Sequence, residues 1–321
     1  MRYPTMNSGI LLLDKPTGSS SAKALYPVKR TFPGSKVGHT GTLDPFASGL
    51  LVVLIGHATR LSRYFLKLDK KYTATMKLGE ETDTLDRMGT VTDRAELPDP
   101  NRMQAEIHRF KGTIVQQPPR YSALKVQGKR AYQLARQGIE PELAPRQVSV
   151  YSLSLSPITC ADLAGLPSRY TLEVHCGSGT YIRALARDIG LAVGSRAFLE
   201  ELRRTQVGPF TVAEAHPERL ITIPDALRRL GTIPIVPVDA GESDCLRLGK
   251  ALDHCLSTWT KDHLESLSKA GDHSMAGEPD SYYVLLVDSR DREVALIEDL
   301  RQKSTGPKWR YTAVFSTGNL Q

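Results

Sequence analysis

Cysteine is scarce in this chain of 321 residues, and the few cysteines lack the spacing of a metal site. The four are Cys160, Cys176, Cys245 and Cys255, and no two of them form a Cys-x-x-Cys pair. The eight histidines form no His-x-x-x-His or His-Glu-x-x-His motif. Because structural zinc sites need closely spaced Cys and His ligands, we expect no metal ion, and we expect free thiols in a reducing compartment.

Long apolar runs are also missing. No segment approaches the about 20 apolar residues that a membrane-spanning helix requires. The N-terminus leads straight into the short apolar run Ile10–Leu13, with neither the apolar core of a secretory signal nor an arginine-rich presequence. No heptad pattern indicates a coiled-coil partner. We therefore expect a cytoplasmic monomer that does not associate with a membrane.

Basic residues are concentrated in one part of the chain, which carries a net charge of +7 overall. Residues 240–321 contain ten Lys and Arg against thirteen Asp and Glu, a net charge of −3. The remaining 32 basic and 22 acidic residues give residues 1–239 a net charge of +10. A basic domain favours a polyanionic partner, because neutralising phosphates releases bound counterions. The charge thus points to nucleic acid as the partner of the N-terminal part.

Helix-like and strand-like segments follow one another without a regular βαβ alternation. This order favours an α+β fold with a mixed or antiparallel sheet over a doubly wound parallel sheet. Apolar periodicity predicts strands at residues 9–14, 50–55, 72–78, 147–154 and 170–175. The same criterion predicts helices at residues 22–31, 58–68, 102–110 (capped by Asn101), 129–137, 179–192, 197–203 and 224–230.

A change in composition predicts a domain boundary near residue 233. The segment 233–238 is apolar and interrupted by prolines, which is typical of a connector. We predict a larger domain at residues 1–232 and a small β-rich domain at residues 233–321. The small domain is expected to contain a helix at 247–252, strands at 282–287, 294–300 and 311–315, and a polar, mobile loop at about 258–280.

The most informative segment is the loop from Val37 to Gly49, which holds a single carboxylate, Asp44. Gly41 and Gly49 permit backbone angles that other residues resist, and Pro45 disfavours a helical conformation of Asp44. The loop runs directly into a predicted buried strand. An isolated Asp-Pro is typical of an ordinary turn, but this longer pattern favours a carboxylate held at a fixed angle for function.

Further motifs occur before and after this loop. They are Leu13-Asp14-Lys15-Pro16-Thr17-Gly18, Lys71-Tyr72, Thr82-Asp83-Thr84-Leu85-Asp86, Pro118–Lys125 with Gly128–Tyr132, Gly179-Thr180-Tyr181-Ile182-Arg183, and Leu202-Arg203-Arg204-Thr205 with Gly208-Pro209-Phe210. Together with the Asp44 loop, and in this order, they resemble the TruB-type pseudouridine synthases over about 200 residues.

The resemblance implies a mixed-sheet pseudouridine synthase catalytic domain and, more loosely, a small PUA-like domain after it. It also implies that the protein isomerises the uridine at position 55, in the T-arm of tRNA, without a guide RNA. In this reaction the N1–C1′ bond breaks, the uracil turns over, and C5 bonds to C1′. No redox change accompanies these steps, so no cofactor is expected.

The resemblance assigns catalytic roles to Asp44, Tyr72 and Arg183. Asp44 either attacks C1′ or removes the 2′ proton to give a glycal, and the sequence leaves both alternatives open. Arg183 is the ion-pair partner that keeps Asp44 ionised, because desolvation in a closed pocket would otherwise raise the pKa of the carboxyl group. Tyr72 stacks on the target base and is a candidate to accept the C5 proton.

Other residues are expected to bind the RNA. His39 is implied to act as a wedge when the uridine is extruded from its stack, and Tyr181 to line the pocket. Lys15, in the first motif, is assigned to the same RNA-binding set. A basic cluster with interleaved tyrosines is expected to contact the RNA backbone, with a solvated charged face as the alternative. This basic cluster comprises Arg120, Lys125, Lys129 and Arg130.

Other interpretations remain open. One is a guide-dependent ribosomal RNA pseudouridine synthase, and another is an RNA-binding or tRNA-folding module. A glycoside hydrolase is disfavoured, because such enzymes usually need two carboxylates beside the bond. Arg203 and Arg204 are expected either to contact RNA or to close the domain. Asp83 and Asp86 are expected to form a turn rather than a metal site.

Overall fold

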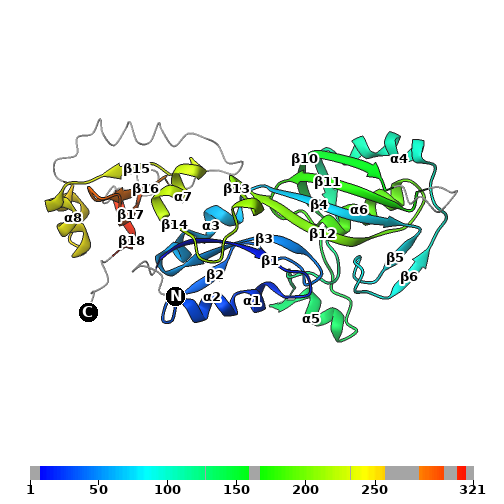
Figure 1. Ribbon diagram of the computed structural model, residues 1–321, viewed down its shortest axis with the longest axis horizontal. Helices are drawn as coiled ribbons and strands as arrows, with labels where there is room; N and C mark the ends of the chain where they lie inside the picture. The colour runs from blue at the N-terminus through cyan, green and yellow to red at the C-terminus, as the bar shows by residue number, and fades with distance from the viewer. Residues whose placement is uncertain are drawn as a thin grey trace.

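The computed structural model describes residues 8–126, 128–158, 167–231, 233–256, 282–299 and 309–315. These residues form a large sheet and a small sheet in an elongated molecule, with helices arranged over them (Figure 1). The mobile loop predicted at about 258–280, and Cys160, lie outside the described residues. None of the described helices is long and apolar enough to cross a membrane.

The large sheet is mixed. Its strands are β1 (Gly9–Lys15), β2 (Val37–His39), β3 (Ser48–Ile55), β4 (Lys70–Leu78), β7 (Gly112–Gln116), β10 (Arg146–Pro157), β11 (Arg169–Cys176), β12 (Ala197–Val207), β13 (Phe210–Thr211) and β14 (Leu220–Ile221). They follow the order β14-β1-β3-β12-β4-β11-β10-β7, with β2 paired to β3 and β13 to β12. β12 runs parallel to β3 and antiparallel to β4. The predicted α+β class with a mixed sheet is confirmed.

Helices and hairpins surround this sheet. The helices are α1 (Ser21–Ala24), α2 (Tyr26–Thr31), α3 (Ser62–Leu66), α4 (Pro100–Ile107), α5 (Ala131–Arg136), α6 (Ile182–Ala192), α7 (Ile223–Leu230), α8 (Ala240–Arg247) and α9 (Leu252–Cys255), with 3-10 turns η1 (Gly56–Leu61), η2 (His108–Phe110) and η3 (Val212–Glu214). The hairpins are β5 (Glu80–Thr82) with β6 (Val91–Arg94), and β8 (Lys125–Val126) with β9 (Lys129–Arg130). α6 buries Leu185 and Ile189 against Met76 of β4 and Leu172 of β11.

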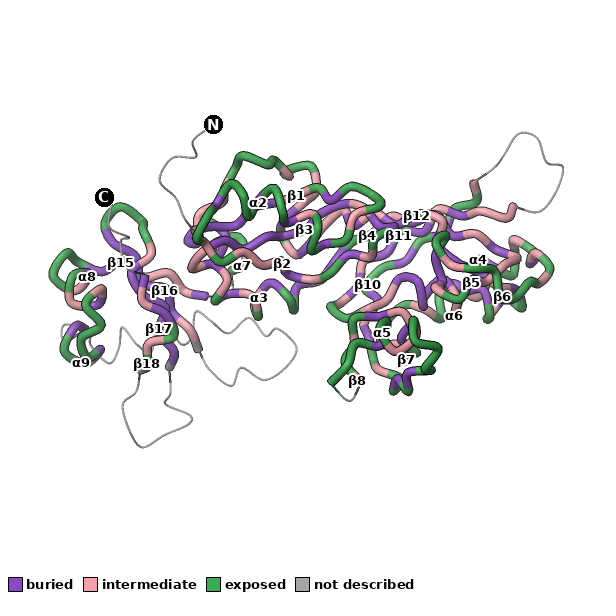
Figure 2. Tube along the Cα trace, turned by 90° about the horizontal axis from the view of Figure 1, so that it is seen from below, coloured by how far each residue is buried: buried purple, intermediate pink, exposed green. Residues whose placement is uncertain are grey.

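β3 explains why an uninterrupted apolar run follows the Asp44 loop. Leu50 and Val52 pack in a cluster with α3 and α7 on one side of the strand. Leu51 and Val53 pack with α2 on the other side. A strand that is buried on both faces needs apolar residues at every position rather than at alternate ones. The end of the Asp44 loop is thereby anchored in the interior (Figure 2).

The helix predicted at residues 197–203 is wrong, because this segment forms the first part of β12. The segment is rich in Leu, Glu and Arg, whose local propensity favours a helix. In the fold, β12 lies between β3 and β4 and makes backbone hydrogen bonds to both. Long-range strand pairing therefore overrides the local preference.

Several element boundaries also differ from the predictions. α4 is capped by Asp99, whose carboxylate accepts a hydrogen bond from the backbone N–H of Asn101. The helix predicted at residues 247–252 falls largely between α8 and α9. Lys129 and Arg130 form β9 and are not part of α5. The predicted connector at residues 233–238 contains β15 (Ile235–Pro237), a strand of the small sheet.

The small sheet packs against the large one. It contains β15, β16 (Tyr282–Val287), β17 (Glu293–Asp299) and β18 (Trp309–Val314), in that order. Leu285 of β16 and Phe315 after β18 belong to the same apolar cluster as Ile10 of β1 and Leu50 of β3. The two sheets therefore share part of a core, and the division of the chain at residue 232 stays a prediction.

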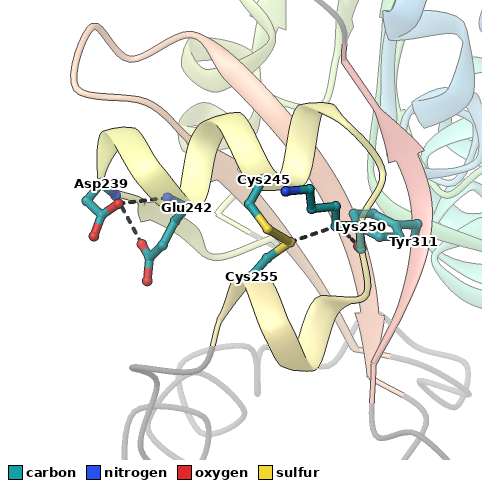
Figure 3. The surroundings of a disulfide bond; sticks show 6 residues. All are labelled: Asp239, Glu242, Cys245, Lys250, Cys255 and Tyr311. Atoms are coloured by element: carbon teal, nitrogen blue, oxygen red, sulfur yellow. Dashed lines mark hydrogen bonds between the residues drawn. A yellow bond between two sulfur atoms is a disulfide. The ribbon is translucent and has the colours of Figure 1, made fainter.

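The expectation of free thiols is wrong for two cysteines. Cys245 of α8 and Cys255 of α9 form a disulfide, with their Cα atoms 5.5 Å apart, beside Tyr311 of β18 (Figure 3). Cys176 is a buried free thiol. Ten positions separate the bonded pair along the chain, a spacing that matches no cysteine motif. The helical hairpin brings the sulfurs together, and the spacing alone does not indicate it.

Replacing both Cys245 and Cys255 with serine is expected to lower the free energy of unfolding by about 2–3 kcal/mol, because a cross-link restricts the unfolded chain. Urea denaturation of the oxidised wild type and of the variant measures this change. Wild-type protein in reductant is the control and should behave like the variant. Peptide mapping without reductant should find the Cys245–Cys255 linkage, and two alkylated thiols there would contradict the assignment.

Candidate active site

Asp44 lies in the loop between β2 and β3, and hydrogen bonds hold the backbone on both sides of it. The hydroxyl of Ser21 accepts from the backbone N–H of Leu43 and donates to the Leu43 carbonyl, both at 2.9 Å. The carbonyl of Pro45 accepts from the backbone N–H of Gly18 at 2.8 Å. The Asp44 side chain keeps 34% of its surface exposed. The carboxylate is therefore held in place and stays accessible to a substrate.

Arg183, in the first turn of α6, connects Asp44 to a second carboxylate. Its Nε lies 2.9 Å from Oδ2 of Asp44, and its Nη1 lies 3.4 Å from Oδ2 of Asp86. Nη1 also donates to the carbonyl of Thr84 at 2.5 Å, and Nη2 donates to that of Tyr121 at 2.7 Å. The Nε–H bond is not directed at a hydrogen-bond acceptor, so its contact with Asp44 is an ion pair without good hydrogen-bond geometry.

The arginine of this ion pair is buried, which strengthens its electrostatic effect. Only 3% of the Arg183 side chain is exposed. Water screens a buried charge poorly, so the guanidinium acts strongly on the carboxylates beside it. Asp44 thus has a fixed cation next to it, and this cation can stabilise negative charge on the carboxylate during a reaction.

A strained turn presents Asp86 to Arg183. Leu85 has a φ of +60°, which is uncommon for a residue other than glycine. The Asp86 carboxylate accepts hydrogen bonds from the Thr84 hydroxyl at 2.8 Å and from the backbone N–H of Met88 at 3.0 Å. Burial raises the pKa of Asp86, and the charge of Arg183 opposes that shift. The predicted turn is present, and the ion pair to Arg183 is a feature that the sequence analysis missed.

Tyr72 and His39 lie around a buried arginine, Arg204, close to the Asp44 loop. Burial raises the pKa of Tyr72, and the positive charge of Arg204 opposes that shift. Burial, and then the charge of Arg204, lowers the pKa of His39, so its imidazole is neutral at pH 7. The Nδ1 of His39 is buried and has no hydrogen-bond partner among the described residues. A neutral ring of this kind suits stacking better than ion pairing.

Lys15 is buried close to the Asp44 loop, and its predicted role in RNA binding stays a prediction. Its side chain is fully buried, and Nζ donates to the carbonyls of Ser19 at 2.6 Å and Pro16 at 3.0 Å. Burial lowers the pKa of Lys15 to about 8, and the negative charge of Asp44 opposes that shift. Lys15 is therefore a buried cation within electrostatic reach of Asp44.

The basic cluster lies apart from these groups. Lys125, Lys129 and Arg130 are exposed on the β8–β9 hairpin, which projects from the large sheet with α5 (Figure 2). Arg120 is also exposed and pairs with Glu140 at 2.6 Å. The connection to Asp44 is indirect and passes through the Tyr121 carbonyl, which binds Arg183.

Tyr181 is fixed at the edge of the large sheet. Its backbone N–H donates to the side-chain oxygen of Gln116 at 2.8 Å, and its carbonyl accepts from the same side chain at 3.1 Å. The guanidinium of Arg146 lies 4.6 Å from the centroid of the Tyr181 ring. Tyr181 directly precedes α6, so this anchoring also helps to place Arg183.

A cavity of about 570 Å³ lies on the face of the large sheet opposite to the Tyr72 side chain. Asp69, Tyr151 and His175 are among its lining residues. His175 is paired across the strands with Lys71, the neighbour of Tyr72, and successive side chains of a strand point to opposite faces. The cavity therefore does not belong to the Asp44 site.

Comparison with known proteins identifies the family. Residues 29–182 match the model of the TruB family pseudouridylate synthase N-terminal domain, and residues 183–230 match that of the tRNA pseudouridylate synthase B C-terminal domain. The tRNA pseudouridine synthase B of Bordetella avium is 47% identical over 226 residues, which cover 69% of this chain and 87% of the relative. The chain belongs to the TruB family of pseudouridine synthases. The predicted enzyme class, an isomerase, is confirmed.

Other TruB-family members and solved structures agree. The tRNA pseudouridine synthase B of Chromohalobacter salexigens is 44% identical over 240 residues, which cover 74% of this chain and 75% of the relative. A chain in the crystal structure of a Cbf5-Nop10-Gar1 complex has a TM-score of 0.60 and 23% identity, covering 97% of this chain and 85% of its own length. At that identity the likeness supports the fold alone.

Two functional candidates of this TruB-family site were not predicted as such. Asp86 lies in the Thr82–Asp86 motif but was expected only to form a turn. Arg204 was expected to contact RNA or to close the domain, and its 1% exposure excludes RNA contact. Its neighbour Arg203 pairs with Asp14 at 2.7 Å on the surface. Both missed residues lie inside motifs, but their partners come from distant parts of the chain: Arg183 of α6 for Asp86, and the carbonyls of Gly41 and Leu50 for Arg204.

Proposed function

We propose that this enzyme converts the uridine at position 55, in the T-arm of tRNA, to pseudouridine without a guide RNA. The observation that carries the proposal is the pair of Asp44 and Arg183, held 2.9 Å apart on a fixed loop and a buried helix start. The relatives named tRNA pseudouridine synthase B support tRNA as the substrate. The basic charge of residues 1–239 also suits a polyanionic substrate.

Asp44 is the proposed catalytic carboxylate. It either attacks C1′ while the N1–C1′ bond breaks, or takes the 2′ proton to give a glycal. In both routes the uracil departs with the N1–C1′ electron pair, turns over, and forms the C5–C1′ bond before C5 loses its proton. Arg183 provides a fixed positive charge beside Asp44 that stabilises the carboxylate whenever it is present during the reaction.

Tyr72 and His39 are proposed to handle the base and the RNA. Tyr72 stacks on the detached uracil, which must be held and yet be free to rotate, and its hydroxyl is the candidate acceptor of the C5 proton. The neutral ring of His39 replaces the extruded uridine in the RNA stack. Extrusion costs a few kcal/mol of stacking and pairing, and an inserted ring offsets part of this.

The basic cluster is proposed to bind the RNA backbone. Replacing Lys125, Lys129 and Arg130 with glutamine should weaken binding of a T-arm RNA about tenfold or more and reduce the slope of log K against log salt by about 2–3. A variant with fewer cations releases fewer counterions from the RNA on binding, so weaker binding and a smaller salt dependence should appear together. Fluorescence titration at several salt concentrations measures both.

A matched control tests whether position, rather than total charge, matters. It removes three charges from α1 and α2 by glutamine substitution of Lys23, Lys29 and Arg30. This variant should bind within about threefold of the wild type. Equal weakening by the two triple variants would show that the β8–β9 hairpin has no special role in RNA binding.

The direct test of the proposed function is a map of pseudouridine in total RNA from cells with and without this protein. The proposal predicts loss of the modification at position 55 of tRNA. Purified enzyme and a T-arm transcript without any other RNA should regenerate the modification. If pseudouridine persists at position 55 of tRNA in cells without this protein and is lost at a ribosomal RNA site, the guide-dependent alternative would be favoured.

A further inference from the structure

Arg204 is a buried guanidinium behind the Asp44 loop, and it is bonded to several parts of the site. It lies on β12, where its cross-strand neighbours are Gly49 of β3 and Tyr72 of β4. Its Nε donates to the carbonyl of Leu50 at 2.7 Å, and its Nη2 donates to the carbonyl of Gly41 at 3.0 Å. Residues paired across two strands have side chains on the same face of the sheet, so the Arg204 side chain lies beside that of Tyr72.

Ion pairing with a carboxylate does not explain why an arginine occupies position 204. Among the described residues, no Asp or Glu lies within ion-pair distance of Arg204, although only 1% of the residue is exposed. Burying an ion without a counter-ion destabilises the folded protein, and neutral side chains could fill the same space with a smaller loss of stability. A planar guanidinium, however, can donate in several fixed directions at once.

The backbone around Arg204 is closely packed, so the side chain has a rigid base. Gly49 has a φ of +104°, and a Cβ at this position would lie 2.2 Å from the Arg204 carbonyl oxygen. Only glycine fits such a contact. The end of the Asp44 loop therefore lies directly against β12, and the Arg204 side chain extends from this contact to both Gly41 and Tyr72.

We propose that Arg204 is a positioning residue that sets the distance between Asp44 and Tyr72. It holds the carbonyl of Gly41, in the loop that carries Asp44, and it packs beside Tyr72, its partner on the neighbouring strand. Asp44 reacts at the sugar and Tyr72 contacts the base, so a fixed spacing keeps the detached uracil beside C1′. This inference rests on the proposed function, because it assigns Arg204 a role through those two residues.

The first test compares Arg204→Met, Arg204→Lys and Arg203→Met. Arg203 is the adjacent arginine, with an exposed ion pair, and serves as the matched control. At saturating T-arm RNA, single-turnover pseudouridine formation by Arg204→Met should be about 100-fold slower, because misplacement of about 1 Å can cost that factor. RNA affinity should change less than threefold. Arg204→Lys should recover part of the rate, and Arg203→Met should be unaffected.

The second test separates positioning from general stability. Tyr72→Ala removes the side chain that Arg204 positions, so adding Arg204→Met to Tyr72→Ala should slow the reaction much less than Arg204→Met slows the wild type. Independent, multiplicative losses would overturn the inference, as would a normal rate for Arg204→Met. If Arg204→Met does not fold, as judged by thermal melting, the same cycle is run with Arg204→Lys. Failure of the wild type to make pseudouridine would instead contradict the proposed function.

Discussion

Asp44→Asn is expected to reduce pseudouridine formation by at least about 10⁴-fold, the scale seen when a residue that carries out the chemistry is removed. Asparagine keeps the size of the side chain but can neither attack C1′ nor take a proton. The backbone bonds around Asp44 do not use its carboxylate, so the loop should keep its conformation. Tritium release from C5-labelled uridine in a T-arm transcript measures the loss.

Binding measurements decide how this loss is interpreted. RNA affinity of Asp44→Asn should stay within about threefold of the wild type, because a substituted carboxylate removes no favourable phosphate contact. Asp14→Asn, which makes the same change in an exposed ion pair with Arg203, is the control and should retain full activity. Turnover by Asp44→Asn near the wild-type rate would remove Asp44 from the mechanism.

Arg183→Met is expected to lower both the reaction rate and the stability. Its guanidinium serves two carboxylates and two carbonyls, and all four would lose their partner. Breaking a buried ion pair by removing one member typically costs about 3–5 kcal/mol of unfolding free energy. The rate should fall at least about 10³-fold, because the reacting carboxylate loses the fixed positive charge beside it. Urea denaturation and single-turnover kinetics measure the two effects separately.

Two further variants make this result specific to Arg183. Arg183→Lys keeps the charge but cannot reproduce both carbonyl bonds of the guanidinium, so only part of the stability and part of the rate should return. Arg187→Met, one turn later on α6, removes an arginine that pairs with Asp188 and donates to the Gln117 carbonyl but pairs with neither Asp44 nor Asp86, so it should cost less stability than Arg183→Met and leave the rate within about threefold. Equal losses for Arg183→Met and Arg187→Met would show that the buried network has no special importance.

The sequence predicted the parts of this site that depend on local chemistry. The glycines and Pro45 around Asp44 predicted a fixed loop, and the apolar run after it predicted the buried strand β3. A cation for Asp44 was also anticipated in Arg183. These features depend on residues that are neighbours along the chain, or on motifs whose order along the chain is itself informative.

Features that depend on distant pairing were not predictable in this way. Residues 197–203 have helical propensity, and only their position between β3 and β4 makes them a strand. Lys15 has the charge of an RNA-binding residue, and only the packing of the loops around it shows that it is buried. The disulfide between Cys245 and Cys255 depends on how α8 and α9 pack together. In each case the deciding partner is absent from the local sequence.

The parallel pairing of β12 with β3 has a consequence for synthesis of the protein. Arg203 and Ser48, which meet in this pairing, are 155 positions apart in the chain. At bacterial elongation rates, β12 leaves the ribosome roughly 10–30 s after β3. For most of that interval the nascent chain contains Asp44 without Arg183, and throughout it without Arg204, and long-range pairing of this kind folds slowly. Truncated translation products that end before β12 are therefore expected to be catalytically silent, whatever RNA they retain.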